Sequence, residues 1–278
     1  MKKRKYEEIK YPINIKRMSD LDISEKMGKL EVINTANNLD KPLCDNLVEP
    51  LPNFSGFSWV IAAPSGSGKS TLLTSLMTQK SNKGEPKKSY RKLFDRIIII
   101  SPTMGNGTSM KNDPFKSIPE GQKFKEFNYE TMRQVYDMCE ENHDNEEHTI
   151  VLMDDIGAQL RKSAQAEKLL VSFLQNRRHI WTSCFILVQK YKDLPVGIRN
   201  NMTHFTTFRP KNQIEIEAIM MELFPYKKKH WQQIIDYVFD NDDRFSFLMV
   251  DMSLKKTNKF RFFNKFNEMF ITAPNDDD

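Results

Sequence analysis

Residues 63–71 read Ala-Pro-Ser-Gly-Ser-Gly-Lys-Ser-Thr, and this stretch decides the fold. It follows a short apolar run at 57–62 and precedes a segment, 69–80, whose apolar residues recur at one-turn helical spacing. Gly66 and Gly68 permit a tight turn in which backbone N–H groups converge without side chains in the way. A glycine-rich turn between a strand and a helix N-terminus is typical of a phosphate-binding loop.

The residue types of the loop predict a nucleotide site. We expect the Lys69 ammonium to reach the β- and γ-phosphates and the Ser70 hydroxyl to ligate Mg²⁺. Thr71 is expected beside the α-phosphate. Ala63 stands where the strict pattern has Gly, and its small side chain is tolerated there. The residues expected to bind the nucleotide are Pro64, Ser65, Gly66, Ser67, Gly68, Lys69, Ser70 and Thr71.

A second chemical signal follows the apolar run at 149–153, which ends in Asp154 and Asp155. Asp154 is expected to hold Mg²⁺ through its water shell, because Mg²⁺ prefers oxygen ligands and keeps several waters. Asp155 occupies a position that more often carries Glu, and it could act as the general base or position the attacking water. The run at 184–189 ends in Gln189, which is expected beside the γ-phosphate if its strand lies between those of the loop and of the Asp pair.

Apolar runs and helical patterns alternate along the middle of the chain. Because strands that alternate with helices form parallel sheets covered on both sides, the fold class expected is α/β. The expected strands are 57–62, 96–101, 149–154, 184–189 and 205–208. The motif order predicts a RecA-like P-loop NTPase with strand order 5-1-4-3-2. We divide the chain into a basic and polar extension (1–50), the ATPase core (51–212) and a C-terminal addition (213–278). The addition is expected to contain helices, a hairpin formed by the runs at 245–250 and 259–263, and an acidic tail.

Composition narrows the class of protein further. Three cysteines and five histidines show no disulfide framework and no metal-ligand spacing, so an intracellular setting is expected. No apolar run approaches the length of about 20 residues that spans a bilayer. The net charge is +5, with basic clusters at 2–17 and 80–92. Such clusters can attract a phosphate backbone, although a solvated surface explains each of them as well.

Two arginines are candidates for an arginine finger, and the sequence does not decide between them. An arginine finger accelerates phosphoryl transfer by about 10³–10⁵. Arg178 ends the helix after the Asp pair, and Arg199 follows the strand of Gln189. Either could act on a neighbouring copy, but the helix dipole alone favours Arg177 and Arg178 at a helix C-terminus.

Four stretches together resemble the poxvirus-type genome-packaging ATPases of the FtsK–HerA superfamily. They are 63–71, Ile-Val-Leu-Met-Asp-Asp-Ile (150–156), Gln-Asn-Arg-Arg-His (175–179) and the stretch 186–201 with its Leu-Pro-x-x-Ile-Arg-Asn. The resemblance covers about residues 55–210. It implies ATP and Mg²⁺ as ligands, a hexameric or pentameric ring around double-stranded DNA, and capsid or portal-type vertex proteins as partners. It also implies a place in the viral factory of the host cytoplasm, or in the virion.

Two other interpretations stay open. The chain could be a P-loop kinase or an unrelated ATPase, but Gln189 and the lack of an obvious Arg-rich lid speak against a kinase. It could instead be a nucleotide-gated scaffold with little turnover, which Asp155 in place of Glu supports. If DNA is bound, the segments 83–92 and 103–121 and the basic N-terminal arm are candidates for contacting its backbone.

Overall fold

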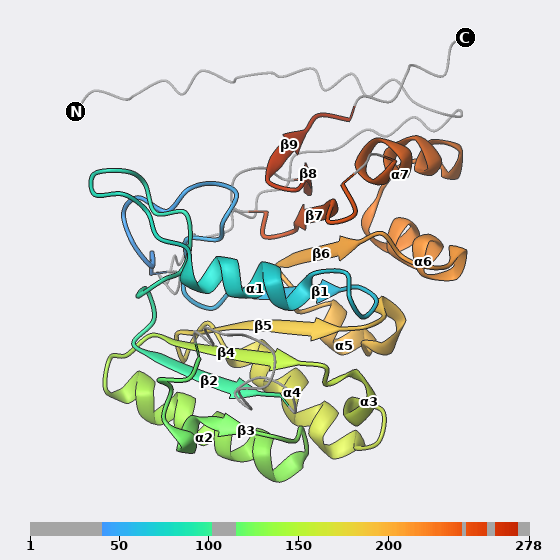
Figure 1. Ribbon diagram of the computed structural model, residues 1–278. Coiled ribbons are helices and arrows are strands. Elements are labelled where there is room, and N and C mark those ends of the chain that lie inside the picture. Colours follow the sequence, from blue (N-terminus) through green and yellow to red (C-terminus); the bar gives the residue numbers. More distant parts are fainter. Residues whose placement is uncertain (1–40, 102–114, 241–242, 255–258, 272–278) are drawn as a thin grey trace, which may run out of the picture. The chain divides into compact units, whose positions relative to one another are not determined.

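The computed structural model describes residues 41–101, 115–240, 243–254 and 259–271 (Figure 1). Most of the expected N-terminal extension, its basic arm, most of the 103–121 segment and the acidic tail lie outside the described residues. Among the helices that are described, none has the length and apolar character needed to cross a membrane.

The described strands form one sheet. Its order is β3-β2-β4-β5-β1-β6-β7-β8-β9. The five strands up to β6 that the sequence predicted occur in the order β6-β1-β5-β4-β2, which confirms 5-1-4-3-2, and all of them pair in parallel. The strands are β1 Ser58–Ala62, β2 Arg96–Ile100, β3 Lys123–Phe124, β4 Thr149–Asp154, β5 Thr182–Val188, β6 His204–Phe208, β7 Phe247–Asp251, β8 Arg261–Asn264 and β9 Asn267–Met269.

The sheet is wider than the sequence predicted. The short strand β3 adds to one edge beside β2. At the other edge, β7 pairs antiparallel with β6, and β8 and β9 follow by further antiparallel pairing. The expected hairpin at 245–250 and 259–263 therefore forms as β7 and β8, but it continues the central sheet.

Helices cover both faces, as the α/β pattern predicted (Figure 1). Leu73 and Leu76 of α1 pack with Trp59 on one face, whereas α2, α4, α6 and α7 pack on the other. The side chain of Asn128 accepts a hydrogen bond from the Thr131 amide and caps α2. The helices are α1 Lys69–Thr78, α2 Tyr129–Asp144, α3 Gly157–Leu160, α4 Ala164–Asn176, α5 Val196–Arg199, α6 Gln213–Leu223 and α7 Trp231–Phe239, with 3₁₀ turns at Glu120–Gln122, Tyr191–Asp193 and Lys228–His230.

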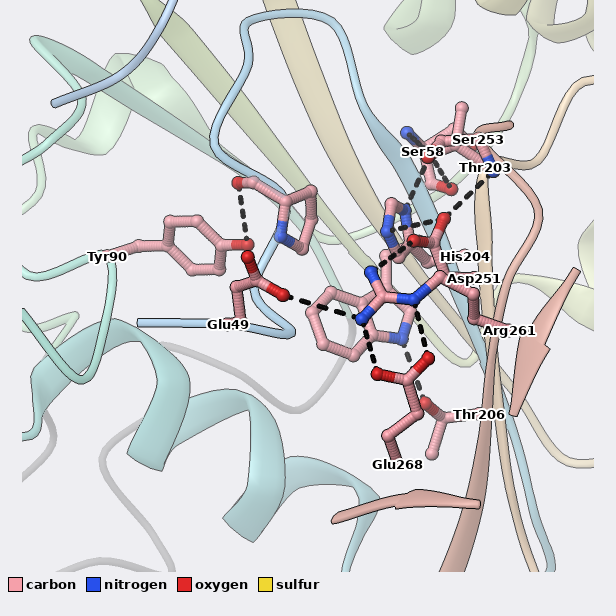
Figure 2. Close-up of polar contacts among 12 residues, drawn as sticks. Glu49, Ser58, Tyr90, Thr203, His204, Thr206, Asp251, Ser253, Arg261 and Glu268 are labelled. Carbon is pink, nitrogen blue, oxygen red and sulfur yellow. Dashed lines mark hydrogen bonds and ion pairs between the residues drawn. The ribbon is translucent and has the colours of Figure 1, made fainter. Parts of the chain in front are cut away.

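A cluster of charged side chains fixes the antiparallel edge of the sheet (Figure 2). Arg261 of β8 donates two hydrogen bonds to Glu268 of β9, at 2.9 and 2.8 Å, and lies 3.4 Å from Glu49. Asp251 of β7 lies between Arg261, at 3.7 Å, and Nε2 of His204 in β6, at 3.3 Å. Four neighbouring strands are thus joined through side chains as well as through their backbones.

Candidate active site

The glycine-rich loop runs from the C-terminal end of β1 to the first turn of α1. Gly66 and Gly68 have φ values of 79° and 104°, in the region that side chains disfavour, so both positions require glycine. The Lys69 side chain folds back over the loop, where Nζ donates to the carbonyl oxygens of Ala63 at 2.5 Å and Pro64 at 3.1 Å. The loop is therefore closed on itself around the lysine.

The two carboxylates lie at the end of β4. Asp154 is buried, and the Ser101 hydroxyl, just beyond β2, lies 3.4 Å from its Oδ2. Asp155 has a φ of 53°, a left-handed conformation that is uncommon outside glycine and that recurs at functional sites. Its Oδ1 accepts a hydrogen bond from the Gln189 amide at 3.0 Å. This pair arises because β5, which precedes Gln189, lies between β4 and β1.

One cavity of 450 Å³ joins the loop to the carboxylates, within the size range of small-molecule sites. Pro64 borders a neighbouring cavity of 250 Å³ together with Ser65 and Gln189. The Ser67 hydroxyl donates to the Pro64 carbonyl within the loop at 2.8 Å. The larger cavity is lined by Ser65, Gly66, Gly68, Lys69, Ser70, Thr71, Asp154, Asp155, Gln189, Arg244 and Phe245.

Electrostatics in the cavity suit an anion with a hard cation. Burial lowers the pKa of Lys69, and the charges of Asp154 and Asp155 oppose this shift only in part. The ammonium is therefore partly stripped of water, and an anionic ligand would stabilise it. The Ser70 hydroxyl and the Asp154 carboxylate face the same cavity, and such oxygen donors fit Mg²⁺.

The two arginine candidates do not line this cavity. Arg199 instead donates from Nε to Glu222 at 3.0 Å and from Nη1 to the Leu194 carbonyl at 2.8 Å. Arg178 packs against Gly56, where a Cβ would lie 2.8 Å from the Arg178 Cα. Gly56 precedes β1, so Arg178 lies at the opposite end of that strand from the phosphate loop. Within one chain, neither arginine reaches the loop.

Sequence reasoning missed Arg244 and Phe245, which complete the cavity. Both precede β7, a strand antiparallel to β6. The start of an antiparallel strand lies at the edge where its parallel neighbours end, which here is the edge of the phosphate loop. The apolar run at 245–250 was visible, but its place beside β6 was not.

Solved structures share this fold. The DNA-packaging ATPase B204 of Sulfolobus turreted icosahedral virus superposes with a TM-score of 0.53 at 12% identity, over 75% of this chain and 97% of that one. B204 of Sulfolobus turreted icosahedral virus 2, in complex with ATP-γS, gives 0.50 at 12% identity, over 74% and 96%. At this identity the likeness establishes the fold, a P-loop NTPase α/β sheet.

Relatives are also found by sequence. The DNA packaging protein OPG160 of Variola virus and that of Vaccinia virus are each 29% identical over 155 residues. The match covers 55% of this chain and 53% of each relative, so the chain spans about half the length of the curated relatives that it matches. The family described as Poxvirus A32 protein matches residues 52–268. This chain belongs to the poxvirus A32 protein family.

Proposed function

We propose that the chain is an ATP-hydrolysing motor that moves double-stranded viral DNA into a preformed capsid. One observation carries the proposal: Lys69, Ser70, Asp154, Asp155 and Gln189, from three separate segments, face a single cavity. This is the set of groups that phosphoryl transfer to water requires. That the hydrolysis drives DNA packaging is supported by the OPG160 relatives, which are DNA packaging proteins, and by B204, a DNA-packaging ATPase.

The phosphate loop binds the polyphosphate of ATP. Backbone N–H groups of the loop and of the N-terminus of α1 would donate to it. Lys69 would exchange its contacts with the loop carbonyls for the β- and γ-phosphates. Ser70 and Asp154 would hold Mg²⁺, since both face the cavity with oxygen donors. Mg²⁺, when bound, neutralises charge on the β- and γ-phosphates.

Asp155 activates the attacking water. Its carboxylate accepts the proton or orients the water for attack on the γ-phosphorus. The amide of Gln189 donates to this carboxylate at 3.0 Å, and this hydrogen bond would orient the carboxylate toward the attacking water. Gln189 also follows β5 directly. A change in its contact with the γ-phosphate would therefore be transmitted to β5, in the centre of the sheet.

The trans-acting arginine comes from a neighbouring copy in a hexameric or pentameric ring. Arg178 and Arg199 are the candidates, and neither lines the cavity of its own chain. Arg199 must leave Glu222 to do so. DNA, and capsid or portal-type vertex proteins, are the partners in the viral factory or the virion.

A basic surface on the α1–β2 connection is suited to the DNA backbone. Lys80, Lys87 and Arg91 line a cavity of 310 Å³ there, within the 80–92 cluster. Lysine and arginine bind phosphates irrespective of base sequence, as packaging requires. Neutralising these three residues should reduce stimulation by DNA and its dependence on salt.

ATP hydrolysis with and without long double-stranded DNA tests the proposal. We expect stimulation by DNA of any sequence, abolished in Lys69→Ala and in Asp155→Asn. Asp155→Asn should still bind ATP, because the phosphate loop is intact. Tight binding of ATP without turnover, at concentrations where the chain assembles and with DNA present, would refute the motor and leave the nucleotide-gated scaffold.

A further inference from the structure

The connection between α7 and β7 brings two side chains to the phosphate loop from a distant part of the chain. Arg244 and Phe245 line the cavity together with Lys69, Ser70 and Asp155. Both side chains are exposed, Phe245 to 45%. They are therefore open to the cavity and accessible to a ligand bound there.

Contacts on the other side hold this connection in place. Oδ1 of Asp243 accepts a hydrogen bond from the Phe245 amide at 2.8 Å, and its Oδ2 pairs with Lys265 in the β8–β9 turn. The Lys265 amide in turn donates to the Phe247 carbonyl at 2.8 Å. Phe247 is buried, and its ring centroid lies 5.5 Å from that of Phe208. The connection is thus attached to the core and to the last hairpin.

Phe245 lies between the phosphate loop and the guanidinium of Arg244. A Cβ placed on Gly68 would lie 3.2 Å from Cδ1 of Phe245. On the phenylalanine ring, Cζ of Arg244 lies 4.5 Å from the centroid, a cation–π contact. This contact places the guanidinium on the ring that lies against the Gly68 position of the loop.

The charges around the cavity favour an anion at Arg244. Lys69 and Arg244 are the basic groups that line it, and Asp154 and Asp155 are the acidic ones. Across the described ranges, no carboxylate is within ion-pair distance of Arg244. Even with Mg²⁺ bound, Lys69 alone would leave the polyphosphate and the two carboxylates with an excess of negative charge. An arginine fork matches phosphate oxygens in geometry and in charge.

We propose that Arg244 is a phosphate ligand that the chain supplies to its own bound nucleotide, and that Phe245 positions it. The inference rests on the proposed nucleotide site and names a further residue of it. It makes the antiparallel edge of the sheet part of the active site, because β7 and the β8–β9 turn hold Arg244 in place. Loss of the γ-phosphate from the bound nucleotide would then change the contacts of Arg244 and, through it, act on β7 and the β8–β9 turn.

Affinities for ATP, ADP and AMP, measured by calorimetry on the full chain, test the role of Arg244. Loss of a charge-assisted hydrogen bond predicts about 10- to 100-fold weaker ATP binding in Arg244→Gln. AMP affinity should change by less than about twofold, and Arg244→Lys should restore part of the ATP affinity, since it keeps the charge. Arg133→Gln, on the exposed face of α2, is the matched control and should change none of the three.

Phe245 has its own pair of variants. Phe245→Tyr keeps the ring and should bind ATP as the wild type does, whereas Phe245→Leu should weaken ATP binding and leave AMP binding and the melting temperature unchanged. Unchanged ATP affinity in Arg244→Gln would overturn the inference. Equal losses for ATP and AMP would overturn it too, in favour of contact with the nucleoside. If the wild type binds ATP and Lys69→Ala does not, the nucleotide site stands whatever Arg244 does; a wild type that binds no ATP would overturn both.

Discussion

The amide of Gln189 donates a hydrogen bond of 3.0 Å to the carboxylate of Asp155. The two residues follow β5 and β4, which are adjacent strands, and Asp155 meets the amide from a left-handed backbone conformation. Both line the cavity of the phosphate loop. A strained aspartate held by a neutral amide is well suited to orient one water molecule, and this relationship leads to the first prediction.

Gln189→Ala should reduce the rate of ATP hydrolysis by about 100-fold, because positioned proton transfer contributes about 10²–10⁴. ATP affinity should stay within about threefold, since the phosphate loop is unchanged. The matched control is Gln232→Ala, which removes an amide–carboxylate hydrogen bond of 2.7 Å to Asp236 on the exposed face of α7. Single-turnover kinetics with separate measurement of ATP binding would check this. An equal loss in both variants would contradict it.

The strand order was predictable once the order of the motifs was interpreted as that of a RecA-like sheet. In that arrangement the strand ending at Gln189 lies between the strand of the phosphate loop and the strand at 149–154, and the order β6-β1-β5-β4-β2 confirms this. Residues that follow parallel strands meet at one edge of the sheet. The RecA-like strand order therefore brings Gln189 to the edge of the sheet where the Asp pair lies, but its hydrogen bond to Asp155 was not predicted, and its place beside the γ-phosphate stays a prediction.

The remaining features depend on contacts that leave no local pattern. Arg244 reaches the cavity only because β7 pairs antiparallel with β6, and nothing near residue 244 in the sequence indicates that pairing. Arg199 matched a family stretch, yet its guanidinium binds Glu222 of α6. Tertiary packing of the C-terminal elements decides both cases.

Gly68→Ala should lose nucleotide binding as well as stability. Its φ of 104° disfavours any side chain, and the new Cβ would lie 3.2 Å from Phe245. Gly84→Ala is the control, because its φ is 87° and no atom lies within 4 Å of the new Cβ. Both changes should cost about 1–3 kcal/mol of unfolding free energy through backbone strain. Only Gly68→Ala should weaken ATP binding in calorimetry. Wild-type ATP affinity in Gly68→Ala would refute the close packing of the loop.

Thiol labelling should distinguish the three cysteines. Cys139 and Cys184 are buried, whereas Cys44 is partly exposed. Burial raises the pKa of Cys139 to about 12 and also raises the pKa of Cys184. At pH 8 the folded protein should therefore react with iodoacetamide at Cys44, and the other two should react only after unfolding. Peptide mass spectrometry of the labelled protein reads this out. Rapid native labelling of Cys139 would show that α2 opens readily.

The same shift predicts a pH effect on stability. Because the folded-state pKa of Cys139 lies above the unfolded value of 9.0, the folded protein retains its proton longer than the unfolded chain. This contribution is complete below pH 9.0 and is lost as the pH rises toward 12. The melting temperature of the wild type should fall between about pH 9 and 11, and that of the Cys139→Ala variant should fall less steeply over the same range. Parallel curves for the two proteins would contradict the assignment.

Two arginine–glutamate pairs that differ in burial should differ in their contribution to stability. Arg261, whose side chain is 12% exposed, binds Glu268 and lies beside Asp251, which contacts His204. Arg261→Met leaves the Asp251 charge at the sheet edge with less compensation, and should cost about 2–3 kcal/mol of unfolding free energy.

Arg96 binds Glu147 with two hydrogen bonds of 2.6 and 2.8 Å, but its side chain is 44% exposed. Arg96→Met should therefore change the urea midpoint little, because water replaces the lost contact. Equal losses in urea unfolding would mean that burial of the Arg261 cluster does not set its contribution.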